Sequence, residues 1–222
     1  MSKLPLYLGT ISPRLWNDRS KMSSEVFMSG KPQFDEVAVI AAAIDVFWRN
    51  GYAAAAISDL TEATGLSRSS LYQRFHDKDG LFQEALEAYM QRALRRMNSP
   101  KADTARGLLK ALLRAFLPDR SRPAGCLIGR SCAEISALSK EGQAATLAAA
   151  ARQREILAGL LREGVAAGEL AEDTDIDAMA WYYLGVLQAV LNFPQAGADP
   201  SMLDRMIDVA MSVWPSTVLS DS

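Results

Sequence analysis

Apolar side chains recur at steps of three and four residues along most of the chain after residue 33, and they do not form long alternating runs. The first such stretch comprises Phe34, Val37, Ile40, Ala41, Ile44, Phe47 and Trp48. A step of three to four residues is the repeat of an amphipathic α-helix, whereas a half-buried strand alternates. The sequence therefore predicts an all-α protein, whose later helices span 104–117, 124–138, 143–167, 174–193 and 202–214.

Four helices are predicted between residues 34 and 98. Gly51 is expected to end the first helix as a left-handed cap, and Ser58, Ser67 and Asp77 to cap the next three. The second and third helices are short and are separated by a tight turn that contains Gly65, which is the arrangement of a helix-turn-helix. The fourth helix is expected to bury Leu81, Phe82, Ala85, Leu86, Tyr89, Ala93, Leu94 and Met97.

The third helix has side chains suited to contact DNA. In a helix-turn-helix, the N-terminal residues of the second helix face base edges in the major groove. Arg68 can pair with guanine or contact a phosphate, and Gln73 can pair with adenine. The net charge is −2, and residues 31–80 contain five basic and seven acidic side chains, so any basic surface is local. The spacing alone also fits a short helix pair that binds no DNA.

A longer set of residues resembles a known family. Residues 34–86 are similar to the N-terminal domain of the TetR family of bacterial transcriptional repressors. The matching features are "NGY" at 50–52, Ile57, Leu60, Gly65, "SLYQRF" at 70–75, Lys78 and "LF" at 81–82. One departure is Ala56, where many members have a hydroxyl. The resemblance covers residues 30–95 strongly and the rest of the chain only as architecture.

The resemblance implies a homodimer that places one such helix in each half of a palindromic double-stranded operator and is released by a small-molecule effector. The presence of only two cysteines favours a reducing cytoplasm. Residues 1–33 contain prolines, glycines and serines without a helical period and have a net charge of +3, so a flexible basic arm is expected there. A DNA-binding domain is expected at 34–80, and a ligand-binding and dimerisation domain at 81–222. The DNA contacts that the resemblance implies are Ser58, Arg68, Ser69, Ser70, Tyr72, Gln73, Arg74 and Lys78.

The segment 178–193 is apolar nearly all round, so a helix there must be covered on more than one side. One face is expected to pack against the rest of the chain, and the other against a second subunit. The segment therefore predicts a homodimer through the last two helices. In the last helix, the expected contacts are Leu203, Met206, Ile207, Ala210 and Trp214. The alternative is that both faces are buried within one chain.

A pocket for a mainly apolar effector is expected between the fourth helix and the middle helices. Aromatic and methionine side chains with a few polar groups suit such a ligand. The candidate lining residues are Tyr89, Met97, Leu112, Phe116, Leu127, Arg130, Glu134, Trp181 and Tyr182. Arg130 and Glu134 are four residues apart and are expected to pair. The alternative is that these side chains belong to an ordinary core.

Cys126 and Cys132 form neither a disulfide framework nor a zinc pattern, and their spacing does not place them on one helical face. A sensor of oxidants or electrophiles on the same fold remains an alternative, as does a helical interaction protein without a DNA partner. The chain has one histidine, His76, and no phosphate loop or metal-ligand spacing, so no enzyme, cofactor or metal site is expected. The chain has no signal-peptide pattern and no segment suited to span a membrane.

Overall fold

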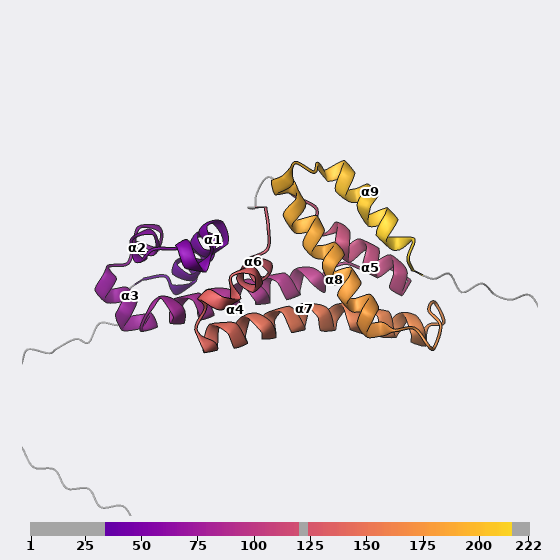
Figure 1. Cartoon of the computed structure of the whole chain (residues 1–222), viewed down its shortest axis with the longest axis horizontal. Helices are drawn as coiled ribbons and strands as arrows, with labels where there is room; N and C mark the ends of the chain where they lie inside the picture. Colours follow the sequence, from indigo (N-terminus) through magenta and orange to yellow (C-terminus); the bar gives the residue numbers. More distant parts are fainter. Residues whose placement is uncertain (1–33, 120–123, 215–222) are drawn as a thin grey trace, which may run out of the picture. The chain divides into compact units, whose positions relative to one another are not determined.

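The computed structural model describes residues 34–119 and 124–214, so the predicted basic arm at 1–33 lies outside the described residues. Within these ranges the secondary structure is helical and contains no strand, which confirms the all-α prediction (Figure 1). The elements are α1 (Glu36–Ala54), α2 (Ile57–Thr64), α3 (Arg68–Phe75), α4 (Lys78–Met97), α5 (Ala105–Arg114), α6 (Leu127–Ala133), η1 (Ile135–Ala137), α7 (Lys140–Ala166), α8 (Ile176–Asn192), η2 (Phe193–Ala196) and α9 (Pro200–Met211).

Local capping signals explain where several helices begin. The Ser67 hydroxyl accepts a hydrogen bond from the Ser70 amide at 3.1 Å, and Asp77 Oδ1 accepts one from the Gly80 amide at 2.8 Å. Thr104 caps α5 in the same way through the Gly107 amide. These bonds satisfy amide groups that have no partner within the helix. The predicted caps at Ser67 and Asp77 are therefore confirmed.

Two predicted helix ends are wrong. Ser58 does not cap α2, because the helix begins one residue earlier and Ala56 is its N-cap residue. Asp59 supplies the local hydrogen bond instead, by accepting from the Ala56 amide at 3.1 Å. Gly51 has φ 81° and ψ 170°, which is not a left-handed cap; it interrupts the helical geometry, and one further turn follows to Ala54.

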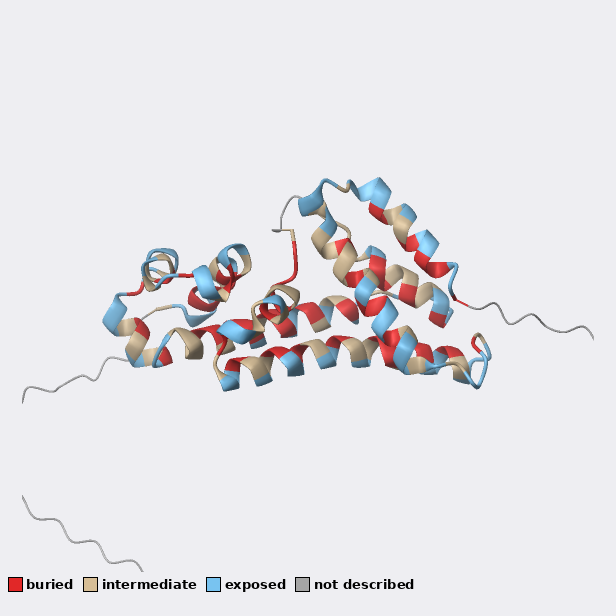
Figure 2. Ribbon diagram, viewed as in Figure 1, coloured by how far each residue is buried: buried red, intermediate tan, exposed pale blue. Residues whose placement is uncertain are grey.

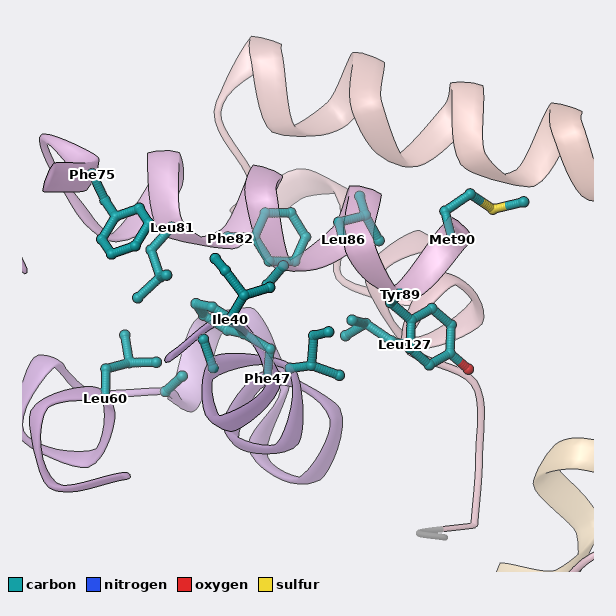
Figure 3. Close-up of a cluster of buried hydrophobic side chains, with 14 of the residues drawn as sticks. Ile40, Phe47, Leu60, Phe75, Leu81, Phe82, Leu86, Tyr89, Met90 and Leu127 are labelled. Carbon is teal, nitrogen blue, oxygen red and sulfur yellow. The ribbon is translucent and has the colours of Figure 1, made fainter. Parts of the chain in front are cut away.

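The first core joins α1–α4 to α6 and the beginning of α7. Figure 3 shows side chains of α1, α2, α3, α4 and α6 meeting in this core. Phe82 lies edge-on to Phe47, with ring centroids 5.3 Å apart, and 5.0 Å from Tyr52. Val37 is 73% exposed, so its place in the predicted apolar stripe is wrong. The buried face of α1 instead runs through Val39, Ile40, Ala43, Ile44 and Phe47.

The second core lies among α5, α7, α8 and α9 and also receives Met97 from the end of α4. α9 is buried on one side and exposed on the other (Figure 2). Four residues expected at a subunit contact face this core instead: Leu203, Ile207, Ala210 and Trp214 are buried within the chain. That part of the predicted contact is wrong, because α9 uses this face to cover its own domain.

α4 connects the two cores. Its first part belongs to the core of α1–α3, and Met97 belongs to the second core. The expected domain boundary after residue 80 lies within the first turn of this continuous helix. The expected helix at 124–138 is divided into the seven residues of α6 and the short 3-10 helix η1, and the one at 104–117 ends at Arg114. No helix in the described ranges is long and apolar enough to cross a membrane.

Candidate nucleic-acid interface and ligand cavities

The turn between α2 and α3 is fixed by one glycine and two apolar anchors. Gly65 has φ 71° and ψ 5°, a left-handed conformation that glycine adopts without strain. Leu60 precedes the turn and Leu71 follows it, and both are fully buried. Phe75 is also buried, so α3 is held along one side. Its opposite side faces away from the protein and forms the candidate nucleic-acid interface.

The exposed side of α3 carries hydroxyl, amide and guanidinium groups. Arg68, Ser69 and Gln73 are exposed, and Ser70 and Tyr72 are half-buried. The Ser67 hydroxyl lies 2.9 Å from each of the hydroxyls of Ser69 and Ser70, so the helix begins with a cluster of three hydroxyls. Arg68 Nη2 donates to the Tyr72 hydroxyl at 3.4 Å, and no carboxylate among the described residues pairs with Arg68.

The other two predicted cations have partners within the protein. Arg74 forms ion pairs with Glu36 and with Glu84, and these carboxylates raise the pKa of its guanidinium. Lys78 Nζ donates to the backbone oxygens of Tyr52 at 3.0 Å and Ala55 at 3.2 Å. Arg74 therefore connects α3 to α1 and α4, and Lys78 connects the start of α4 to the end of α1. Ser58 is exposed on α2, and its hydroxyl donates to Asp59 at 3.4 Å.

Two cavities lie beside the helices that follow. The first, which we call the α4 cavity, has a volume of about 420 Å³ and includes Asp45, Arg92, Arg96 and Asp119 among its lining residues. The second, which we call the α6 cavity, has a volume of about 730 Å³ and is lined by α1, α6, α7, α8 and neighbouring residues. Both volumes suit a small molecule, since ligand pockets hold roughly 300–1,000 Å³.

The residues predicted to form one pocket are divided between several places. Tyr89 and Phe116 line the α4 cavity, whereas Arg130 and Trp181 line the α6 cavity. Neither cavity is lined by Met97, Leu112, Leu127, Glu134 or Tyr182. The first three of these are buried in the two cores, and Tyr182 is 40% exposed on α8. The prediction of a single pocket formed by these residues is wrong, because a helical repeat marks apolar faces and not the gaps between helices.

Trp48 is the main residue that the predicted site omitted. It extends from α1, lines both cavities, and lies edge-on to Tyr89 with ring centroids 5.0 Å apart. Gln153 of α7 also lines the α6 cavity, and it is only 1% exposed. The sequence indicated Trp48 only as a large aromatic residue at the edge of the apolar face of α1. A buried glutamine in a helix gives no comparable signal in the sequence.

Cys126 and Cys132 are free thiols that both line the α6 cavity. Cys126 is buried at the start of α6, where its Sγ accepts a long hydrogen bond from the Gly129 amide at 3.5 Å. Burial raises the pKa of Cys132, and the nearby Cys126 raises it further. A raised pKa lowers the thiolate fraction at neutral pH, and the thiolate is the reactive form.

We therefore expect Cys132 to react with iodoacetamide several-fold more slowly than glutathione does at pH 7.5. Mass spectrometry of a Cys126→Ser variant measures the rate at Cys132 alone. The rate should keep increasing as the pH passes the ordinary thiol pKa, since the folded-state pKa lies above it. A Cys132→Ser variant provides the matched measurement for Cys126. Reaction of Cys132 as fast as glutathione would instead favour the thiol-sensor alternative.

The comparisons with known proteins agree with this geometry. Residues 39–85 match the sequence model of "Bacterial regulatory proteins, tetR family", and residues 106–210 match "Tetracyclin repressor-like, C-terminal domain". The chain is 27% identical over 196 residues to the HTH-type transcriptional repressor ComR of Escherichia coli K12, an alignment that covers 85% of this chain and 93% of ComR.

Two further relatives reach 30% identity. The HTH-type transcriptional regulator YezE of Bacillus subtilis aligns over 84% of this chain and 99% of its own length. A cysteine mutant of the TetR family transcriptional regulator CifR, solved with a 26-base-pair double-strand operator DNA, superposes with a TM-score of 0.71. That match covers 84% of this chain and 100% of the CifR chain. The chain therefore belongs to the TetR family of bacterial regulatory proteins.

Proposed function

We propose that this protein is a repressor that binds a palindromic operator as a homodimer and leaves it when a small molecule binds its C-terminal domain. Its family consists of DNA-binding regulators and not of enzymes. The observation that carries the proposal is the exposed side of α3, where Arg68, Ser69 and Gln73 face outward above the buried anchors Leu71 and Phe75. This arrangement allows a helix to enter the major groove while its other side stays packed.

The proposed DNA contacts have different roles. Arg68 and Gln73 contact base edges, and the small Ser69 and Ser70 allow the helix to approach closely. Tyr72 and Ser58 contact phosphate oxygens and fix the position of the helix. Lys78 has two backbone acceptors in the protein, which leaves one of its three N–H donors for a phosphate. Arg74 is proposed to hold α3 against α1 and α4 through its two carboxylate partners.

DNA binding itself is tested by fluorescence anisotropy with labelled fragments, first from the region upstream of the protein's own coding sequence and then from a genomic library selected for binding. We expect saturable binding that weakens steeply as salt increases, because each phosphate contact releases counterions. Failure of every selected fragment to bind would favour a helical interaction protein instead.

The substitution Arg68→Ala is expected to weaken operator binding by about ten- to hundredfold, since a good bidentate contact to a base contributes roughly 1–3 kcal/mol. The matched control is Arg74→Ala, which removes the same side chain from the same helix. Its carboxylate partners are partly exposed, so we expect less than about a fivefold change. Equal losses in the two variants would contradict the proposed orientation of α3.

The effector part of the proposal rests on the two cavities. Both are lined by Trp48 of α1, and the α4 cavity is also lined by Tyr89, Arg92 and Ala93 of α4. A molecule in either cavity therefore contacts a helix that supports α3. Binding that favours a different placement of α1 or α4 lowers the affinity for the operator, because two ligands that favour different conformations oppose each other. The proposal fails for any cavity ligand that leaves operator affinity unchanged.

A further inference from the structure

Three buried polar atoms at the wall of the α6 cavity have no hydrogen-bond partner among the described residues. They are Trp48 Nε1, Arg130 Nε and Gln153 Oε1, and Gln153 is only 1% exposed. Leaving a buried donor or acceptor unpaired costs roughly 1–3 kcal/mol, so such groups are uncommon in a finished core. In a mostly apolar cavity, a few polar atoms of this kind are what orient a ligand. These atoms lie just behind the surface of the α6 cavity, so two donors and one acceptor become available to a ligand when the side chains beside them move.

Arg130 is the only charged side chain that the described residues contribute to this cavity. Its Nη2 donates to the backbone oxygen of Asn50 at 3.0 Å. Its Nε lies 3.4 Å from Glu134 Oε1, which is an ion pair without hydrogen-bond geometry. The Nε–H therefore has no good acceptor, and because Nε is itself buried, another acceptor reaches it only when neighbouring side chains such as Glu134 move. A planar guanidinium binds carboxylates especially well, since both its geometry and its charge match.

Arg130 and Glu134 also hold the end of α1. Glu134 Oε2 accepts a hydrogen bond from the Ala53 amide at 3.0 Å, while Arg130 donates to Asn50. Gly51 lies between these two contacts, and a side chain there would collide with Glu134 and with Arg130. We call these four residues, Asn50, Ala53, Arg130 and Glu134, the α1 clasp. It joins a wall of the α6 cavity to the helix that supports the DNA-binding helices.

We propose that the α6 cavity binds an apolar molecule that bears a carboxylate. The carboxylate replaces Glu134 as the partner of Arg130 Nε, and the loss of this ion pair weakens the contacts of the α1 clasp. The apolar body lies against Ile128, Leu184 and Trp181, and a donor on the ligand has Gln153 Oε1 as its partner. This inference rests on the proposed function, because it names the effector class and the first step of its action.

Calorimetry without DNA tests the site. The probes are decanoate and phenylacetate, each compared with its primary amide, which has nearly the same shape and no charge. We expect each carboxylate to bind at least about tenfold more tightly than its amide, since a hydrogen bond to a charged group contributes roughly 1.5–3 kcal/mol. Arg130→Gln should abolish this difference. Glu134→Gln should tighten carboxylate binding, because it removes the competing charge.

Three results would overturn the site: equal binding of amides and carboxylates, no binding of either carboxylate, or a carboxylate preference that persists in Arg130→Gln.

The clasp is tested by amide hydrogen exchange at Ala53, which should accelerate when decanoate is bound. Unchanged exchange in the bound protein would overturn the link to α1. If decanoate binds and opens the clasp but operator affinity stays the same, the proposed release fails while the site stands. If neither carboxylate binds but operator binding responds to other molecules, the site fails while the proposed function stands.

Discussion

The double variant Tyr182→Asp, Val209→Asp is expected to be a monomer at micromolar concentration, where the unsubstituted protein is expected to be a dimer. Tyr182 is 40% exposed and Val209 is 70% exposed, although both are large and apolar. Phe193, Met202 and Val213 are likewise exposed along η2, α9 and the residues after it. Since exposed large apolar side chains often mark interaction sites and both helices carry them, we propose that α8 and α9 form the subunit contact.

The expected effect is large because the contact is symmetric. Burying one large apolar side chain contributes roughly 1.5–3 kcal/mol, and a two-fold interface buries each residue twice. Only 40% of Tyr182 and 70% of Val209 remain to be buried, so two substitutions per chain remove roughly 3–6 kcal/mol, which raises the dimer dissociation constant by about a hundred- to ten-thousandfold. Light scattering coupled to size-exclusion chromatography measures the mass directly.

The matched control is Leu147→Asp, which introduces the same charge at an apolar side chain of α7 that is 60% exposed. It should leave the dimer intact, since α7 is not part of the proposed contact. A dimeric double variant would show that α8 and α9 do not form the contact. A monomeric Leu147 variant would place the contact on α7 instead.

The sequence predicted best those features that depend on neighbours along the chain. Ser67 and Asp77 cap α3 and α4, and both bonds join residues three apart. The apolar stripe of α4 was predicted for the same reason, since one helical repeat decides which side chains share a face. At Ala56 this logic failed: the chain begins α2 without a hydroxyl cap, and Asp59 compensates from inside the helix.

The features that remained hidden depend on residues far apart in the sequence. Glu134 bonds to Ala53 across 81 positions, and no local pattern indicates that partnership. The predicted pairing of Arg130 with Glu134 is confirmed as an ion pair, but its contact with α1 was not predicted. The α6 cavity was equally hidden, since Gln153 and Trp48 belong to it only because α1, α7 and α8 converge there.

The substitution Phe82→Ala is expected to lower the free energy of unfolding by about 3–5 kcal/mol, the usual cost of truncating a fully buried phenylalanine. Phe82 is completely buried and lies against Phe47 (Figure 3), and its ring also contacts the ring of Tyr52. It lies on α4, whose first part shares one core with α1–α3. Truncation therefore leaves a cavity where α4 packs against the DNA-binding helices. Urea denaturation followed by circular dichroism, at one fixed protein concentration, measures the loss.

Phe82→Leu keeps much of the volume and should cost clearly less than the alanine change, because the penalty increases with the cavity that remains. Leu147→Ala truncates an apolar side chain of α7 that is 60% exposed and lies outside the proposed subunit contact, so its effect on the free energy of unfolding should be small. A loss below about 1 kcal/mol for Phe82→Ala would mean that the core closes around the deletion. In that case α4 could shift against α1 at little cost, and the packing between them would not be the rigid connection through which an effector acts on α3.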